Sequence, residues 1–140
     1  MQKLLLILFV FLIAGCEVLE EDISGKKVRI IAPADRVSVT AGQVDFRWLA
    51  VEYAVGYEFT VVTPSFAAAE RVMVDTVILS DTLGRRFGCR LLLSEGDYEW
   101  SVRGFNSGYT TRSEVRRLTV VPVVEPENSE NSDPAEPLEP

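Results

Sequence analysis

The feature that most constrains the fold is a repeated alternation of apolar and polar residues in short runs. Between Val28 and Val121 these runs are separated by turn residues such as Gly, Pro, Asn and Asp. A period of two puts alternate side chains on one face of a β-strand, whereas an amphipathic helix needs a period of 3.6 residues. The best helical stretch, Phe66–Glu70, is too short to form an element by itself. The sequence therefore predicts an all-β domain of half-buried antiparallel strands.

Seven such runs follow one another at short, regular spacing. In chain order, their apolar sets are Val28–Ile31; Val44, Phe46 and Trp48; Tyr57, Phe59 and Val61; Val72–Leu79; Phe87, Cys89, Leu91 and Leu93; Tyr98, Trp100 and Val102; and Val115, Leu118 and Val120. The buried face of the fourth run is not defined, because both of its alternation phases are mostly apolar. Seven short strands with turns between them predict a sandwich of two sheets.

Several positions also resemble those of fibronectin type III domains, which have an immunoglobulin-like fold. Trp48 is similar to the core tryptophan of the family's second strand, and Ala54–Tyr57 to the entry of the third. Residues 93–106 resemble the family's most recognisable segment, and Tyr98 matches its tyrosine corner, where the hydroxyl bonds to upstream backbone. The departures are Glu95, where the family often has Pro, and Gly104, where it often has Ala. The resemblance implies a seven-stranded sandwich and no particular function.

The N-terminus carries one basic residue, Lys3, and then the unbroken apolar run 4–14. Eleven residues make a helix of about 16 Å, which is short of the roughly 30 Å of hydrocarbon that a membrane span must cross. The run is therefore predicted to be the core of a signal peptide. Residues 12–16, Leu-Ile-Ala-Gly-Cys, resemble the lipobox of bacterial lipoproteins. That resemblance implies cleavage before Cys16 and lipid on its sulfur.

Lipid on Cys16 would hold the mature protein on a membrane, because several acyl chains such as palmitate give durable anchoring. The alternative is an ordinary signal peptide cut after Ala14 or Gly15. Glu17 follows the cysteine, and not the aspartate that retains many lipoproteins at the inner membrane, so the outer membrane is expected. The acidic residues after Cys16 resemble surface-export signals, which leaves both the periplasmic side and the cell surface open.

The net charge of −7 is concentrated at the two ends of the chain. Four acids and no base lie between Glu17 and Asp22, and six acids and no base lie in residues 122–140. Residues 26–121 hold thirteen basic and eleven acidic residues, so the domain is near neutral. Acidic flanks and the lack of a basic stripe argue against a nucleic-acid partner.

The chain is predicted to divide into four parts. These are a signal peptide (1–15), an acidic tether (16–25), the fibronectin type III-like sandwich (26–121) and a disordered, acidic, proline-rich tail (122–140). The tail has almost no apolar side chains after its first residues, so it cannot offset the entropy of ordering.

Catalysis is not expected. The chain has no histidine, and it shows no Gly-rich phosphate loop, Cys-x-x-Cys pair or calcium loop, so we expect no cofactor and no metal. Asp97 and Glu99 share one strand face, but Arg103 lies on the same face, which favours a solvated ion pair. Cys89 alternates in phase with Phe87 and is expected to be a small buried hydrophobe.

Binding has better candidates. The type III topology would bring the loop after the second strand beside the loop after the sixth, gathering Tyr53, Asn106, Tyr109 and Arg112. Tyrosine, arginine and small polar residues recur in recognition loops, although small polar residues also form ordinary turns. The outer sheet face around Thr60, Arg103 and Phe105 is the second candidate.

The whole pattern predicts a non-catalytic, envelope-anchored interaction module. Its partner would be an envelope protein or a carbohydrate, and its role would be that of an accessory to a surface nutrient-capture complex. A structural spacer of the envelope, with no ligand of its own, is the alternative.

Overall fold

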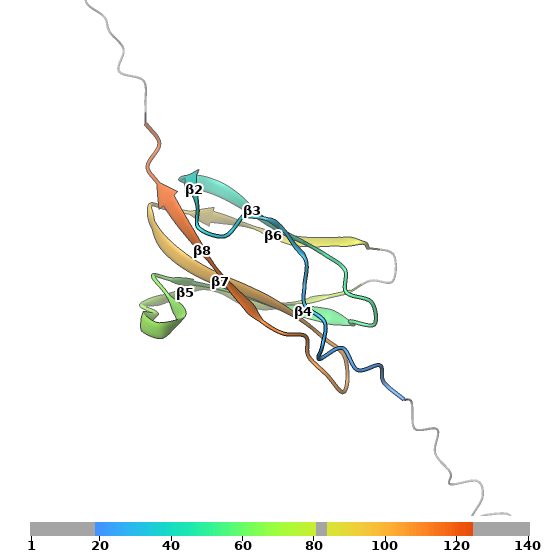
Figure 1. The fold of residues 1–140 in the computed structure, drawn as a ribbon. Coiled ribbons are helices and arrows are strands. Elements are labelled where there is room, and N and C mark those ends of the chain that lie inside the picture. The colour runs from blue at the N-terminus through green and yellow to red at the C-terminus, as the bar shows by residue number, and fades with distance from the viewer. Residues whose placement is uncertain (1–18, 81–83, 125–140) are drawn as a thin grey trace, which may run out of the picture.

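The computed structural model describes residues 19–80 and 84–124, which form two β-sheets packed face to face (Figure 1). The predicted signal peptide, Cys16 and the tail from residue 125 lie outside the described residues. The strands are β1 (Ile30–Ala32), β2 (Val37–Thr40), β3 (Gly42–Leu49), β4 (Gly56–Thr63), β5 (Arg71–Leu79), β6 (Arg86–Leu93), β7 (Gly96–Phe105) and β8 (Glu114–Val121). A short 3-10 turn, η1 (Phe66–Ala68), follows β4.

The sheets have the order β1-β3-β6 and β2-β8-β7-β4-β5. Every pairing is antiparallel except that of β2 with β8. The predicted all-β, fibronectin type III-like sandwich is confirmed. Among the described residues no helix is long and apolar enough to cross a membrane.

Aromatic rings from both sheets fill the space between them. Phe46 and Trp48 of β3 and Phe59 of β4 are fully buried, as is Trp100 of β7. The Phe46 and Trp100 ring centroids lie 5.0 Å apart, edge to face, and the Trp48 and Phe59 rings stack at 5.5 Å. These offset and edge-on arrangements are the ones that aromatic pairs prefer. The inward faces of these strands are those that the alternation predicted.

The tyrosine corner that the resemblance implied is present. The Tyr98 hydroxyl donates a hydrogen bond of 2.8 Å to the carbonyl oxygen of Ser94, just before β7. Tyr98 itself is 4 % exposed and belongs to the core. The bond therefore fixes the turn between β6 and β7 to the buried ring.

The last strand differs from its prediction at Val115, which is 50 % exposed. Leu118 and Val120 are buried as predicted, and a period of two puts Arg116 in phase with them. The Arg116 side chain lies at the rim of the core and donates to the carbonyl oxygen of Pro33. Val115 therefore faces outward, opposite Ser101.

Strand β5 shows why its face could not be assigned from the sequence. A bulge shifts its register on β4 between Val61 and Val62, so that Met73 is left between paired residues. Val77 and Leu79 point outward and are 53 % and 72 % exposed, whereas Ile78 packs on the core. Apolar side chains thus lie on both faces of this edge strand.

Part of the predicted tether packs against the sandwich. Ile23 is fully buried, and the carbonyl oxygen of Glu21 accepts a hydrogen bond of 2.8 Å from Asn106 Nδ2. Lys27 forms a parallel bridge with Arg112. The N-terminal segment is therefore fixed to one end of the domain.

Candidate functional site

The β3–β4 and β7–β8 loops lie side by side, as the resemblance implied, and Asn106 joins them. Its Nδ2 donates to the carbonyl oxygens of Glu21 and Tyr53, at 2.8 and 3.3 Å. Its Oδ1 accepts from the backbone N–H groups of Gly108 and Tyr109, at 3.2 and 2.8 Å. Asn106 is only 7 % exposed. Its amide is fully used within the chain, so it positions the loops and has no group left for a ligand.

The other predicted residues stand at the surface of the same end. Tyr53 is 55 % exposed and Tyr109 is 39 % exposed, and the Lys26 ammonium lies 4.9 Å from the centre of the Tyr53 ring. Arg112 is exposed, and its backbone N–H donates to the carbonyl oxygen of Lys26 at 3.0 Å. We call Lys26, Tyr53, Tyr109 and Arg112 the loop-end cluster. The structure brings these side chains to one end of the domain.

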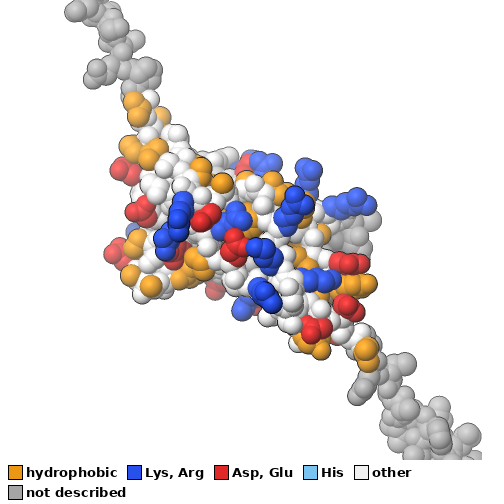
Figure 2. All heavy atoms as spheres, in the orientation of Figure 1, with side chains coloured by type: hydrophobic (Ala, Val, Ile, Leu, Met, Phe, Trp, Pro, Cys, Tyr) orange, Lys and Arg blue, Asp and Glu red, His pale blue; other side chains and the backbone are white. Residues whose placement is uncertain are grey.

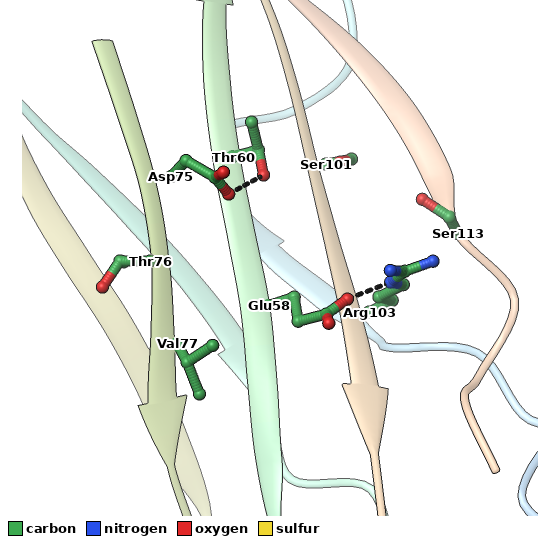
Figure 3. Close-up of a pocket in the computed structure, with 8 residues that line it drawn as sticks. All are labelled: Glu58, Thr60, Asp75, Thr76, Val77, Ser101, Arg103 and Ser113. Carbon is green, nitrogen blue, oxygen red and sulfur yellow. Dashed lines mark hydrogen bonds and ion pairs between the residues drawn. The ribbon is translucent and has the colours of Figure 1, made fainter. Parts of the chain in front are cut away.

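A hollow of about 650 Å³ lies elsewhere, on the outer face of the five-stranded sheet (Figure 3). We call it the sheet hollow. Its lining residues are Glu58, Thr60, Asp75, Thr76, Val77, Ser101, Arg103 and Ser113. All come from β4, β5 and β7, except Ser113, which precedes β8. The hollow is thus built on a hydrogen-bonded sheet and not on loops.

Two polar pairs cross the sheet hollow. Glu58 and Arg103, which are directly opposite each other on β4 and β7, form an ion pair through Glu58 Oε2 and Arg103 Nε. The Thr60 hydroxyl donates to Asp75 Oδ1 at 3.0 Å. Figure 3 shows both pairs, with the Ser101 and Ser113 side chains alongside. The site therefore offers charged groups and hydroxyls on one rigid surface.

The Phe105 ring lies on the same sheet face, two residues along β7 from Arg103. Phe105 faces Gly56 across β7 and β4, and a Cβ added at Gly56 would come within 2.6 Å of the ring. Gly56 therefore lets the ring lie flat on the sheet beside the Glu58–Arg103 pair. The sequence pattern named Thr60, Arg103 and Phe105 as a second candidate surface. It missed Glu58, although its outward alternation phase was a usable signal, and it missed Asp75, whose strand has no defined buried face in the sequence.

The carboxylates considered for catalysis have structural partners. Glu99 Oε1 accepts from Arg117 Nε at 3.2 Å, and Glu99 Oε2 accepts from the backbone N–H of Phe66 at 2.9 Å. Asp97 Oδ1 accepts from the Thr119 hydroxyl at 2.8 Å. The predicted cross-strand ion pair is present, but its partner is Arg117, because Arg103 is paired with Glu58.

Basic side chains gather on the opposite face, a feature that the sequence pattern did not show. Arg47 and Arg90 pair with Asp45 on the three-stranded sheet, and Arg86 follows the same outward phase of β6. Figure 2 shows blue side chains along the upper right, where β3 and β6 run. The hydrogen bond from Arg90 holds the pKa of Asp45 below its usual value. The pairing of β3 with β6 assembles this face from residues about forty positions apart.

The described residues contain no group of three or more His, Cys, Asp and Glu side chains placed to hold a metal ion. Cys89 is half-buried against the core, and burial raises the pKa of its thiol. A raised pKa keeps the thiol protonated and weakly nucleophilic at neutral pH.

No protein-family model matches this chain, and no curated protein matches it. A solution structure of a fibronectin type III domain derived from the human KIAA0970 protein is similar, with 14 % identity and a TM-score of 0.48 over 84 % of this chain and 88 % of that chain. The fold assignment rests on the sheet order and the tyrosine corner. The chain is a fibronectin type III-like β-sandwich.

Proposed function

We propose that this protein is an envelope-anchored, non-catalytic binding module that takes its ligand in the sheet hollow. The observation that supports this is the hollow itself, which at about 650 Å³ falls within the roughly 300–1,000 Å³ typical of ligand sites. Its walls are residues of the paired strands β4, β5 and β7, with Ser113 just before β8, so the site is preformed. Rigid elements hold recognition groups more accurately than loops do.

The lining points to a hydroxyl-rich ligand such as a saccharide. Glu58 and Asp75 accept hydrogen bonds, Arg103 donates them, and the Ser101 and Ser113 hydroxyls form no hydrogen bond with other described residues. Phe105 and Val77 add apolar surface at one side, which suits the C–H face of a sugar ring. A ligand of this kind fits an accessory role in nutrient capture.

The test uses the full lipidated protein in detergent micelles on an array of neutral oligosaccharides, including maltohexaose, cellohexaose and xylohexaose. We expect wild type to bind one glycan class. Arg103→Ala and Asp75→Asn should weaken that binding about tenfold or more, since a lost hydrogen bond to a charged group costs about 1.5–3 kcal/mol. Arg117→Ala, on the same sheet face but outside the hollow, is the matched control and should bind like wild type. No glycan bound by wild type, or equal binding by Arg103→Ala, would overturn the proposal.

A spacer function has one observation in its favour. Residues 19 and 124 leave the sandwich at opposite ends, so the domain holds its N-terminal and C-terminal connections apart (Figure 1). An eight-residue strand extends about 27 Å, which sets the scale of that separation. A protein that binds no ligand on the array would be described best as this spacer.

A further inference from the structure

We infer that the loop end of the sandwich faces the lipid bilayer, and that Tyr53 and Tyr109 contact its headgroup region. This inference rests on the proposed lipid attachment at Cys16. It assigns the loop-end cluster to a lipid surface and leaves the sheet hollow to the ligand.

The first argument is where the chain leaves the domain. Glu21 is hydrogen-bonded to Asn106 and Ile23 is fully buried, so the N-terminal segment does not swing freely from the sandwich. Glu20 lies against the β7–β8 turn, where a Cβ added at Gly108 would be 3.7 Å from Glu20 Cβ. In Figure 1 the segment departs from that turn and runs away from the sheets.

The second argument is the length of chain between this point and the lipid. Cys16 precedes Glu20 by four residues, which span at most about 14 Å when fully extended. The headgroup layer of one leaflet is about 5–8 Å thick. The tether therefore holds the turn at Gly108 at a distance from the membrane of no more than about two thicknesses of the headgroup layer. The other end of the sandwich lies at least one strand length farther along the domain.

The third argument is the chemistry of the exposed side chains. Tyr53 and Tyr109 are 55 % and 39 % exposed, and Leu19, which is 93 % exposed, directly precedes Glu20 at the point of departure. Tyrosine concentrates at membrane interfaces because its ring is apolar and its hydroxyl is polar. The Lys26 ammonium lies over the Tyr53 ring and donates to the carbonyl oxygen of Glu52 at 3.3 Å, which holds it at the same surface as the two tyrosines.

Charge does not drive this contact. Figure 2 shows acidic and hydrophobic side chains side by side at the end from which the N-terminal segment leaves. Glu20, Glu21, Asp22 and Glu52 stand there against Lys26, Lys27 and Arg112. Attraction to anionic lipid is therefore cancelled, and the contact depends on the tyrosines and on the tether. It should be insensitive to salt, because only charge interactions are screened.

The experiment measures the distance of each end from the lipid. The full lipidated protein, carrying Cys89→Ala, receives a spin label at Ser107→Cys or, as the matched control, at Glu95→Cys in the exposed β6–β7 turn of the opposite end. Vesicles of phosphatidylcholine and phosphatidylethanolamine contain a lipid that chelates Ni²⁺ at its headgroup. We expect this Ni²⁺ to enhance the relaxation of the label at position 107 at least several-fold more than that of the label at position 95. Equal enhancement at both positions, or more at position 95, would overturn the orientation.

A second variant tests the tyrosines themselves. With the label at Ser107→Cys, the double substitution Tyr53→Ser with Tyr109→Ser should reduce the enhancement by half or more, and 0.5 M salt should not change it. Unchanged enhancement in the double variant would refute the tyrosine contact. Mass analysis and flotation of the same samples report lipid attachment separately, and binding to the glycan array does not depend on orientation. Failure of the inference is thus distinct from failure of the proposed function.

Discussion

Asn106 shows what a single residue's type can and cannot say about its role. An asparagine next to Ser, Gly and Tyr after a strand fits a recognition loop, and the sequence pattern favoured that role. In the structure its amide is buried and bonds to Glu21 and Tyr53, which lie 85 and 53 positions away. Those partners are set by the sandwich topology, so no local pattern could have shown them. Tyr53 and Tyr109, by contrast, are exposed as predicted.

The predicted consequence is that Asn106→Ala destabilises the domain by about 1–3 kcal/mol, the cost of leaving buried polar groups without a partner. It should also free the N-terminal segment, because the bond to the Glu21 carbonyl is lost. Denaturant unfolding and amide exchange at residues 21–24 measure the two effects. Ser107→Ala, at the exposed neighbouring position, is the control and should stay within about 0.5 kcal/mol of wild type. An Asn106→Ala protein as stable as wild type would show that water replaces the amide.

At the scale of elements, alternation predicted the inward faces of β3, β4 and β7, but it did not define the face of β5 or reveal the four-residue β2. The inward sets of β3, β4 and β7 are those that the pattern predicted, because each strand carries three large apolar residues in its inward phase. Strand β2 was not predicted. It has four residues, and its parallel partner β8 is about eighty positions away. The sheet hollow was found only in part for the same reason: its charged pairs form across strands whose register the sequence does not give.

The β3–β6 pairing should be sensitive to acid through Asp45 and Arg90. The Arg90 hydrogen bond lowers the pKa of Asp45 in the folded state below its unfolded value of about 3.9. A lowered folded-state pKa means that ionised Asp45 stabilises the fold above about pH 4, and that this contribution is lost as pH falls through the folded-state pKa. Asp45→Asn should therefore be less stable than wild type at pH 7, with the difference disappearing toward pH 2.

Urea unfolding across this pH range is the measurement. Arg90→Gln is the matched variant, and it should show the same loss of pH dependence, because either substitution removes the pair. The double variant should lose little more than each single variant. A constant difference between Asp45→Asn and wild type from pH 7 to pH 2 would contradict the assignment.

At the scale of the whole molecule, the N-terminal and C-terminal segments leave the sandwich at opposite ends (Figure 1). The sheet hollow lies on the outer face of the five-stranded sheet (Figure 3). If the loop end is held at the membrane, the outer face of the five-stranded sheet would be exposed to ligands that diffuse along the membrane surface. Glycan binding by wild type would favour the binding module, and its absence would favour the spacer.

This arrangement depends on lipid attachment at Cys16. We predict that the mature protein begins at Cys16, carries diacylglyceryl on its sulfur and remains with the membrane fraction. Mass spectrometry of the N-terminal peptide and fractionation of cells are the measurements. Cys16→Ser should abolish the lipid mass, because only a thiol can form the thioether, whereas Cys89→Ser, at the half-buried core position, should leave both lipid and fractionation unchanged. This prediction would be contradicted by a soluble chain that carries no lipid and is cut after Ala14 or Gly15. In that case the loop-end tyrosines would be free to meet a protein or carbohydrate partner, and they would become a second surface to test beside the sheet hollow.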